Sequence, residues 1–123
     1  LADILDMLRD HARSKEIVLL DYQSSSEGFL VDKIHAWTDE DVTGLLINAG
    51  ALTHTSIALH DAIKASCLPA VELHLSHVHQ REEFRHHSMI APACVGLVSG
   101  FGAMSYQMAF EGLLTKIQQK DRT

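Results

Sequence analysis

The stretch G-L-L-I-N-A-G-A-L-T-H-T-S-I-A-L-H-D-A-I-K-A-S-C-L-P-A-V-E-L, residues 44–73, decides the fold of this chain. It opens with a short apolar run that stops at Asn48 in a polar, glycine-containing segment, which is typical of a buried strand followed by a turn. Residues 56–66 then carry apolar side chains at helical spacing, and residues 70–73 form a second apolar run. This order predicts two strands joined by a helix, the unit from which parallel sheets are built.

The same alternation of helices and strands continues on both sides of this unit. Because the predicted strands are short and apolar throughout, we expect them to be buried on both faces. The sequence therefore predicts the α/β class, with a parallel sheet flanked by helices on both faces, in a single domain spanning residues 1–123. The further predicted elements are a helix at 1–14, a strand at 17–20, a helix at 29–37, a strand at 95–98, and a C-terminal helix at 106–117 that frays into the tail 118–123.

The charge and hydropathy of the chain argue against two classes of partner. A formal net charge of -6, with no block of Lys or Arg, disfavours binding to nucleic acid or to an acidic membrane surface. The apolar stretches are much shorter than the roughly 20 residues that a membrane-spanning helix needs. We therefore expect neither nucleic acid nor a membrane as a partner.

Cysteine usage points to a reducing compartment. Cys67 and Cys94 are the two cysteines, and both lie in apolar sequence surroundings. We interpret them as reduced thiols in the core of a cytoplasmic protein. The first residues show an amphipathic pattern rather than the pattern of an export signal.

Polar segments follow two of the predicted strands at their carboxyl ends. These segments are residues 48–54 and residues 74–85. In parallel α/β folds, ligands bind beyond the carboxyl ends of the strands, where the loops that follow them meet. We expect both segments to line one pocket.

The second segment and the residues just after it are rich in histidine. One interpretation is a metal site, but the cluster has no His-x-x-x-His pair on a predicted helix and no cysteine partner, so we expect no metal. A second interpretation is acid–base chemistry in an anion-binding pocket, and a third is a solvated polar loop. The residues alone support these two about equally. Of the nine histidines, five belong to this cluster: His74, His77, His79, His86 and His87.

His74 is the strongest candidate for acid–base chemistry. It follows a strand and precedes Leu75 and Ser76, where free backbone N–H groups and a hydroxyl are suited to binding a carboxylate. Glu72 lies two residues earlier in the strand, so its side chain points to the same face and is placed to orient the imidazole.

Other polar residues would complete an anion-binding pocket. Arg81 and Arg85 lie close in sequence to His74 and would add planar hydrogen-bond donors for a carboxylate. Asn48 and His54 flank the turn after residues 44–47, where a ligand would lie.

Three polar residues in the following helix have simpler explanations. Thr55 or Ser56 is expected to cap the helix through its side-chain oxygen. Asp61, one turn into the helix, is most simply a solvated acid that complements the helix dipole. From these residues alone we expect structural rather than chemical roles.

Four motifs taken together carry a resemblance to a known family. They are N-A-G-A-L-T-H-T-S at 48–56, L-H-D-A at 59–62, E-L-H-L-S-H-V-H-Q-R-E-E-F-R-H-H-S at 72–88 and G-F-G at 100–102. In order and spacing, this set resembles the type II 3-dehydroquinate dehydratases, and the stretch Q-S-S-S-E-G at 23–28 matches more loosely. The resemblance extends over essentially the whole chain, and its 72–88 block is highly specific.

The resemblance implies a fold, an activity and an assembly. The fold would be flavodoxin-like, with three layers. The activity would be that of a lyase without metal or organic cofactor, which converts 3-dehydroquinate to 3-dehydroshikimate by anti elimination through an enolate. The assembly would be a dodecamer built from trimers, acting in the shikimate pathway towards aromatic amino acids or in quinate breakdown.

The resemblance also implies roles for single residues. His74 matches the general acid that protonates the departing hydroxyl, and Leu75 and Ser76 match the pair that holds the substrate carboxylate. Arg81 matches a structural arginine of the active-site wall. The remaining matched substrate-binding positions are Asn48, His54, Arg85 and Asp61, the last of which would reach the site of a neighbouring subunit.

The usual start of this family has no counterpart in the sequence. Family members begin with a strand, an N-G-P-N-L-N-like segment, and a mobile lid that bears an Arg and a Tyr base. The resemblance places these before Leu1, and neither Tyr22 nor Tyr106 matches the base, so we expect the N-terminal strand and lid to be absent from this chain. The alternative function is a non-catalytic ligand-binding or scaffold homologue that kept the pocket and lost the base.

Overall fold

The computed structural model describes residues 2–121. Most predicted elements are confirmed, including the three strands that follow residue 43. In chain order the helices and strands are α1 (Ala2–Ser14), α2 (Glu27–Thr38), β1 (Leu45–Ile47), α3 (Ile57–Ser66), β2 (Ala70–His74), β3 (Gly96–Ser99) and α4 (Met104–Asp121). Short 3-10 helices occupy the connections after β1 and β2.

The three described strands form one parallel sheet in the order β1-β2-β3. Leu46 of β1 lies opposite Val71 of β2, and Glu72 lies opposite Leu97 of β3. Every residue of β2 is buried, because this strand has a neighbour on each side and a helical layer on each face. The carboxyl ends of the strands therefore meet at one edge of the sheet, around the end of β2.

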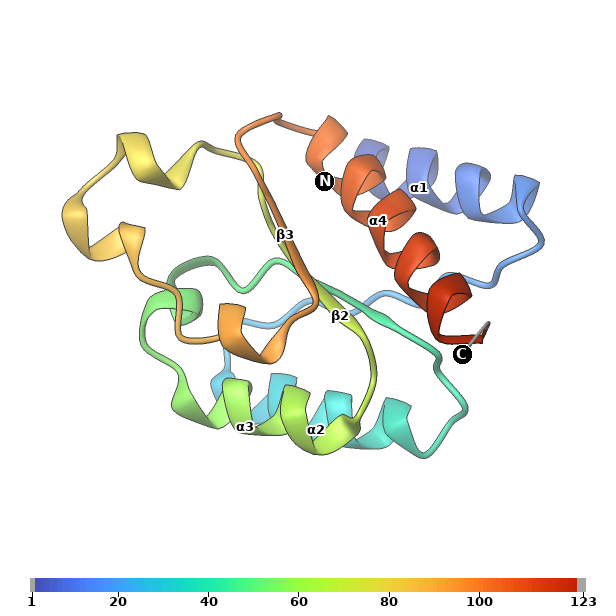
Figure 1. The fold of residues 1–123 in the computed structure, drawn as a ribbon, viewed down its shortest axis with the longest axis horizontal. Coiled ribbons are helices and arrows are strands. Elements are labelled where there is room, and N and C mark those ends of the chain that lie inside the picture. The colour runs from blue at the N-terminus through green and yellow to red at the C-terminus, as the bar shows by residue number, and fades with distance from the viewer. Residues whose placement is uncertain (1, 122–123) are drawn as a thin grey trace.

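Helices cover both faces of the sheet and give three layers (Figure 1). Helices α1 and α4 lie on one face, and α2 and α3 lie on the other. Val71 and Leu73 of β2 pack with Leu113 of α4, whereas Ala70 packs with Ile63 of α3. This alternation places Glu72 on the same face as Ala70, because successive side chains of a strand point in opposite directions.

The strand predicted at 17–20 is wrong, because these residues have no regular secondary structure. Ile17 and Leu19 pack against the cluster between α1 and α4, whereas Val18 is 85% exposed. The segment thus keeps one side towards the core, as a strand would, but it is not part of the described sheet. An apolar run indicates that part of a segment is buried, but strand pairing also needs a neighbouring backbone, about which the run itself carries no information.

Two details of the helices refine the sequence-based prediction. The C-terminal helix does not fray after Ile117, because α4 continues to Asp121; the end of the predicted tail, 122–123, lies outside the described residues. At the start of α3, Ser56 rather than Thr55 is the cap, and its hydroxyl accepts the N–H of Leu59 at 2.9 Å.

Among residues 2–121, no helix is both long enough and apolar enough to cross a membrane.

Replacing Leu73 by Ala should lower the free energy of unfolding by roughly 2–5 kcal/mol, because Leu73 is fully buried between β2 and α4 and its loss leaves a cavity. Leu97→Ala is the matched control, since Leu97 is 49% exposed on β3 and should cost well under ~1 kcal/mol. Urea denaturation followed by circular dichroism at one fixed protein concentration measures both. Equal losses in the two variants would contradict this description of the core.

Candidate active site

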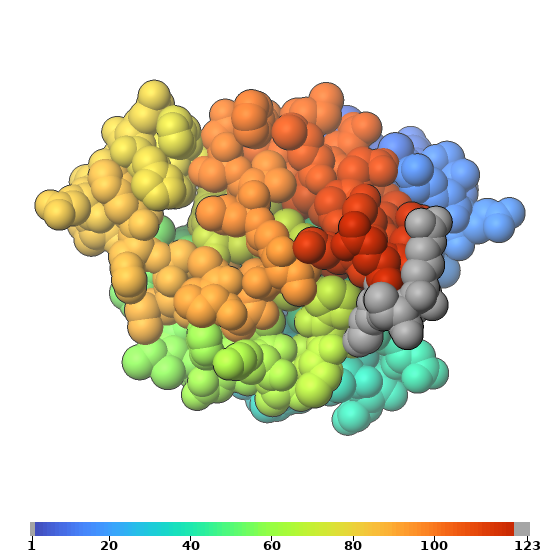
Figure 2. Space-filling model, in the orientation of Figure 1, coloured from blue at the N-terminus to red at the C-terminus, as the bar shows by residue number. Residues whose placement is uncertain are grey.

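A pocket of about 230 Å³ lies at the carboxyl end of the sheet. Its volume is below the roughly 300–1,000 Å³ of sites for drug-sized ligands, so it suits a small molecule. In Figure 2 the segment that follows β2 stands away from the body of the molecule and leaves a hollow beneath it. The lining residues are Asn48, Gly50, Ala51, His54, His74, Leu75, Ser76, Val78, Arg81 and Arg85.

The pocket brings together all but one of the residues predicted to form the site. The segments 48–54 and 74–85 both contribute, as expected for loops that follow neighbouring parallel strands. The exception is Asp61, which lies on α3 with its side chain exposed and does not line this pocket. Asp61 is predicted to reach the site of a neighbouring subunit. The structure contains one chain, so this role stays a prediction.

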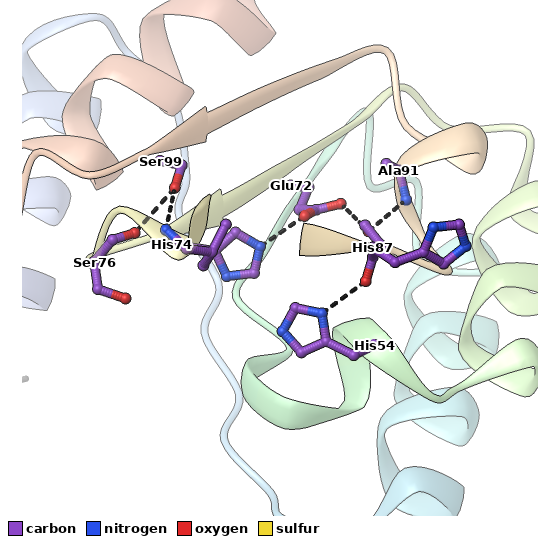
Figure 3. Close-up of polar contacts among 9 residues, drawn as sticks. His54, Glu72, His74, Ser76, His87, Ala91 and Ser99 are labelled. Atoms are coloured by element: carbon purple, nitrogen blue, oxygen red, sulfur yellow. Dashed lines mark hydrogen bonds and ion pairs between the residues drawn. The ribbon is translucent and has the colours of Figure 1, made fainter. Parts of the chain in front are cut away.

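A buried histidine–carboxylate pair forms the floor of the site (Figure 3). His74 Nε2 lies 2.6 Å from Glu72 Oε2, and the two residues are 5% and 2% exposed. The orienting role predicted for Glu72 is therefore supported by direct contact. Because Nε2 is engaged with the carboxylate, Nδ1 is the ring nitrogen of His74 that can exchange a proton with a ligand.

His54 lies beside this pair. Its ring is nearly parallel to the ring of His74, with 14° between the planes and 6.3 Å between the centroids. His54 Nδ1 is 2.8 Å from the carbonyl oxygen of His87, which fixes the ring against the loop that follows β2 (Figure 3). The other ring nitrogen, Nε2, is left to contact a ligand.

The loop that carries the arginines is attached to the start of α3 at further points. His60 Nδ1 lies 2.7 Å from the Met89 carbonyl oxygen, and the Met89 N–H donates to the Thr53 carbonyl at 2.7 Å. Together with the contact between His54 and His87, these bonds join the two sides of the pocket.

Arg85 is the cation best placed to bind an anion. Its Nε donates to Glu82 Oε2 at 2.7 Å, and its guanidinium lies 4.9 Å from the centroid of the Phe84 ring. The pKa of Glu82 is lowered, first by a hydrogen bond from its own backbone N–H and then by the bond from Arg85. The terminal NH₂ groups of Arg85 make no hydrogen bond within the described part of the chain, which leaves them for a carboxylate.

The remaining histidines of the cluster do not form a metal centre in the described residues. His79 stacks on His86 with 5.3 Å between ring centroids, and His77 lies 6.1 Å from His79. Over residues 2–121, no group of three or more His, Cys, Asp or Glu side chains is placed to hold a metal ion.

The sequence did not predict the contacts of two hydroxyl groups at the site. Tyr106 accepts a hydrogen bond from Asn48 Nδ2 at 3.2 Å, and Ser88 donates to Glu72 Oε1 at 2.7 Å. Tyr106 lies in the first turn of the helix that follows β3, which is at the same edge of the sheet as the pocket, so its position in the fold was a usable signal. Ser88 ends the 72–88 motif, but its place far along the loop after β2 gave no indication that it contacts Glu72.

Fold and pocket define the chain as a parallel α/β protein with a small polar pocket built around a buried histidine–glutamate pair. A model of the class II dehydroquinases matches residues 1–114. The chain belongs to this family, which confirms the resemblance found in its motifs.

Relatives and solved structures agree with this assignment. The chain is 55% identical over 119 residues to a 3-dehydroquinate dehydratase of Jannaschia sp. (strain CCS1), covering 97% of this chain and 80% of that protein. It is 52% identical over 118 residues to the 3-dehydroquinate dehydratase of Synechococcus sp. (strain WH7803), with coverage of 96% and 80%. The crystal structure of the type II dehydroquinase from Butyrivibrio crossotus DSM 2876 superposes with a TM-score of 0.88 at 39% identity, covering 91% of this chain and 78% of that one.

The two cysteines differ in their surroundings, and one differs from prediction. Cys67 is exposed at the end of α3, so its predicted place in the core is wrong; Cys94 is partly buried, and both thiols are free. Burial, together with the negative charge of Glu72, raises the pKa of Cys94 to about 12. The thiolate of Cys94 is therefore scarce at neutral pH, and this thiol is a poor nucleophile.

At pH 8, a disulfide reagent such as DTNB should react quickly with one thiol per folded chain, Cys67, and with the second only after unfolding in urea. The reason is that the raised pKa of Cys94 keeps it protonated up to a pH of about 12. In the control variant Cys67→Ser the fast phase should disappear. Two fast thiols in the folded wild-type protein would contradict the described environment of Cys94.

Proposed function

We propose that this protein dehydrates 3-dehydroquinate to 3-dehydroshikimate. The single observation that carries the proposal is the buried Glu72–His74 pair at the base of a small pocket that also contains Arg85. The pair supplies a proton donor and the arginine binds a carboxylate, which are two needs of a reaction on a small hydroxy acid. Relatives that are more than half identical carry the name of this activity.

The reaction proceeds by anti elimination through an enolate. The resemblance assigns the base to a tyrosine on the lid that family members carry ahead of the residue matching Leu1, so turnover is measured on a protein that carries this segment. That base removes a proton from the carbon next to the ketone, and the electron pair of the C–H bond forms the enolate. The enolate then collapses and expels the tertiary hydroxyl, which leaves as water with a proton from His74. The contact with Glu72 fixes the His74 ring and holds Nδ1 towards the ligand.

The polar groups of the pocket wall bind the substrate. Ser76, with the backbone of Leu75, and Arg85 hold the carboxylate, while Asn48 and His54 bind the carboxylate or ring hydroxyls. The Tyr106 hydroxyl accepts one hydrogen of the Asn48 amide, which helps to fix the direction of its oxygen. These contacts set the position of the substrate relative to His74.

A non-catalytic scaffold is the less favoured alternative. Relatives that are more than half identical to the chain carry the name of the enzyme rather than of a scaffold, and the chain keeps the Glu72–His74 pair of the pocket.

We propose that residues 1–123 act as one domain within a dodecamer built from trimers, and that Asp61 completes the site of a neighbouring subunit. The exposed position of Asp61, away from its own pocket, is compatible with this role. The two free thiols fit a reducing cytoplasm, where the enzyme would serve aromatic biosynthesis or quinate breakdown.

His74→Ala should lower kcat by roughly 100-fold or more with a smaller change in KM, because a general acid acts mainly in the transition state. Arg85→Ala and His54→Ala should instead raise the Kd of the substrate, by roughly tenfold each, through the loss of contacts made on binding. Ultraviolet absorbance of the conjugated product follows turnover, and calorimetry gives the Kd. Equal, modest effects on kcat and Kd in all three variants would show that the roles are wrongly assigned.

Subunits carrying Asp61→Asn and subunits carrying His74→Ala should each be impaired alone but recover part of the activity when unfolded, mixed and refolded together. In a mixed oligomer, some sites combine the intact His74 of one subunit with the intact Asp61 of its neighbour. The control is a mixture of His74→Ala with Arg85→Ala. Both residues line the same pocket of one chain, so every pocket in that mixture lacks one of them and little activity should return. No recovery for the first mixture would count against a shared site.

A further inference from the structure

Both oxygens of the buried Glu72 carboxylate have a hydrogen-bond partner. Oε2 contacts His74 Nε2 at 2.6 Å, and Oε1 accepts the hydroxyl hydrogen of Ser88 at 2.7 Å. Glu72 is only 2% exposed, so water cannot readily replace a lost partner. The hydrogen bond from Ser88 therefore helps to fix the Glu72 carboxylate, and the carboxylate in turn fixes the His74 imidazole.

The hydroxyl of Ser88 is itself fixed in direction. It accepts the backbone N–H of Ala91 at 3.0 Å, which occupies a lone pair and leaves its single hydrogen for Glu72. The result is a chain of donors and acceptors from Ala91 through Ser88 and Glu72 to His74; Figure 3 shows Ala91, Glu72 and His74 along it. In a site of low dielectric, successive hydrogen bonds of this kind strengthen one another.

Ser88 also belongs to the loop that carries the binding residues. It lies three residues after Arg85, and the residue before it, His87, accepts the hydrogen bond from His54. The loop thus holds both the acid and its neighbouring histidine in place.

We propose that Ser88 is a positioning residue for the dehydration. Its hydroxyl fixes the Glu72 carboxylate in the plane that holds His74 Nε2, so that His74 Nδ1 is directed at the departing hydroxyl of the substrate. This inference rests on the proposed function of the site. Ser88 does not touch the substrate and acts only through Glu72.

The first test compares turnover in Ser88→Ala, Ser88→Thr and the wild-type protein with 3-dehydroquinate as substrate. Ser88→Ala should lower kcat by roughly tenfold, the effect of losing a hydrogen bond to a charged group, while KM changes by less than about twofold. Ser88→Thr keeps a hydroxyl and should recover most of the loss.

Ser66→Ala is the matched control. The Ser66 hydroxyl is also largely buried, donates to the Ile63 carbonyl at 2.6 Å and accepts the Leu68 N–H at 3.1 Å, but it lies at the far end of α3 from the pocket. Ser66→Ala should lower Tm and leave kcat unchanged. If Ser88→Ala likewise lowers only Tm, Ser88 is merely structural and the inference is overturned.

A double-mutant cycle tests whether Ser88 acts through Glu72. Adding Ser88→Ala to Glu72→Gln should reduce kcat little beyond the loss in Glu72→Gln alone, because the pathway from Ser88 to His74 is already broken. If the two losses multiply, Ser88 acts by another route and the inference fails.

Proton NMR separates this inference from the proposed function. The imidazole N–H of His74 that faces Glu72 should give a downfield signal in the wild-type protein and in Ser66→Ala, and it should weaken or vanish in Ser88→Ala. The signal depends on the hydrogen-bond chain and not on turnover, and its assignment follows from its absence in His74→Ala. A wild-type protein that carries the lid segment and has no dehydratase activity would overturn the proposed function, whereas an unchanged signal in Ser88→Ala would overturn the role of Ser88.

Discussion

The structure depends on a buried carboxylate in the middle of its central strand. Glu72 occupies a position in β2 where the flanking residues are apolar and fully enclosed, and a charge there is tolerated only with well-placed donors. His74 supplies one donor from the same strand, and Ser88 supplies the other from the loop beyond it. The need to satisfy this one side chain therefore links the geometry of the sheet to the geometry of the long irregular loop.

The parallel sheet explains why the chemistry gathers where it does. β1 and β2 end side by side, so Asn48 and His74 reach the same pocket although they lie far apart in sequence. The helix that follows β3 begins at this edge too, and its Tyr106 contacts Asn48. The segments at the ends of β1 and β2 thus both contribute polar groups to a cavity that neither could form alone.

The sequence was most informative where neighbouring residues alone determine the structure. The strands β1 to β3 are short and largely apolar. Asn48 follows the end of β1, and His74 and Arg85 lie at and beyond the end of β2, so their location could be predicted. The run at 17–20 looked equally strand-like, but a strand needs a partner, and partnership is a property of the whole fold. The contact of Ser88 with Glu72 was missed for the same reason, because the two residues lie sixteen positions apart and no periodicity connects them.

The bonds that tie the loop after β2 to the start of α3 have a further consequence for recognition. His54 and His60 contact the carbonyl oxygens of His87 and Met89, and Met89 donates back to Thr53, so the loop is held before any ligand arrives. A loop of this length without such bonds would lose conformational entropy each time a ligand ordered it, and affinity would fall accordingly. Here that entropy is lost during folding, so a small acid with few atoms to contribute can still bind to a site whose shape already exists.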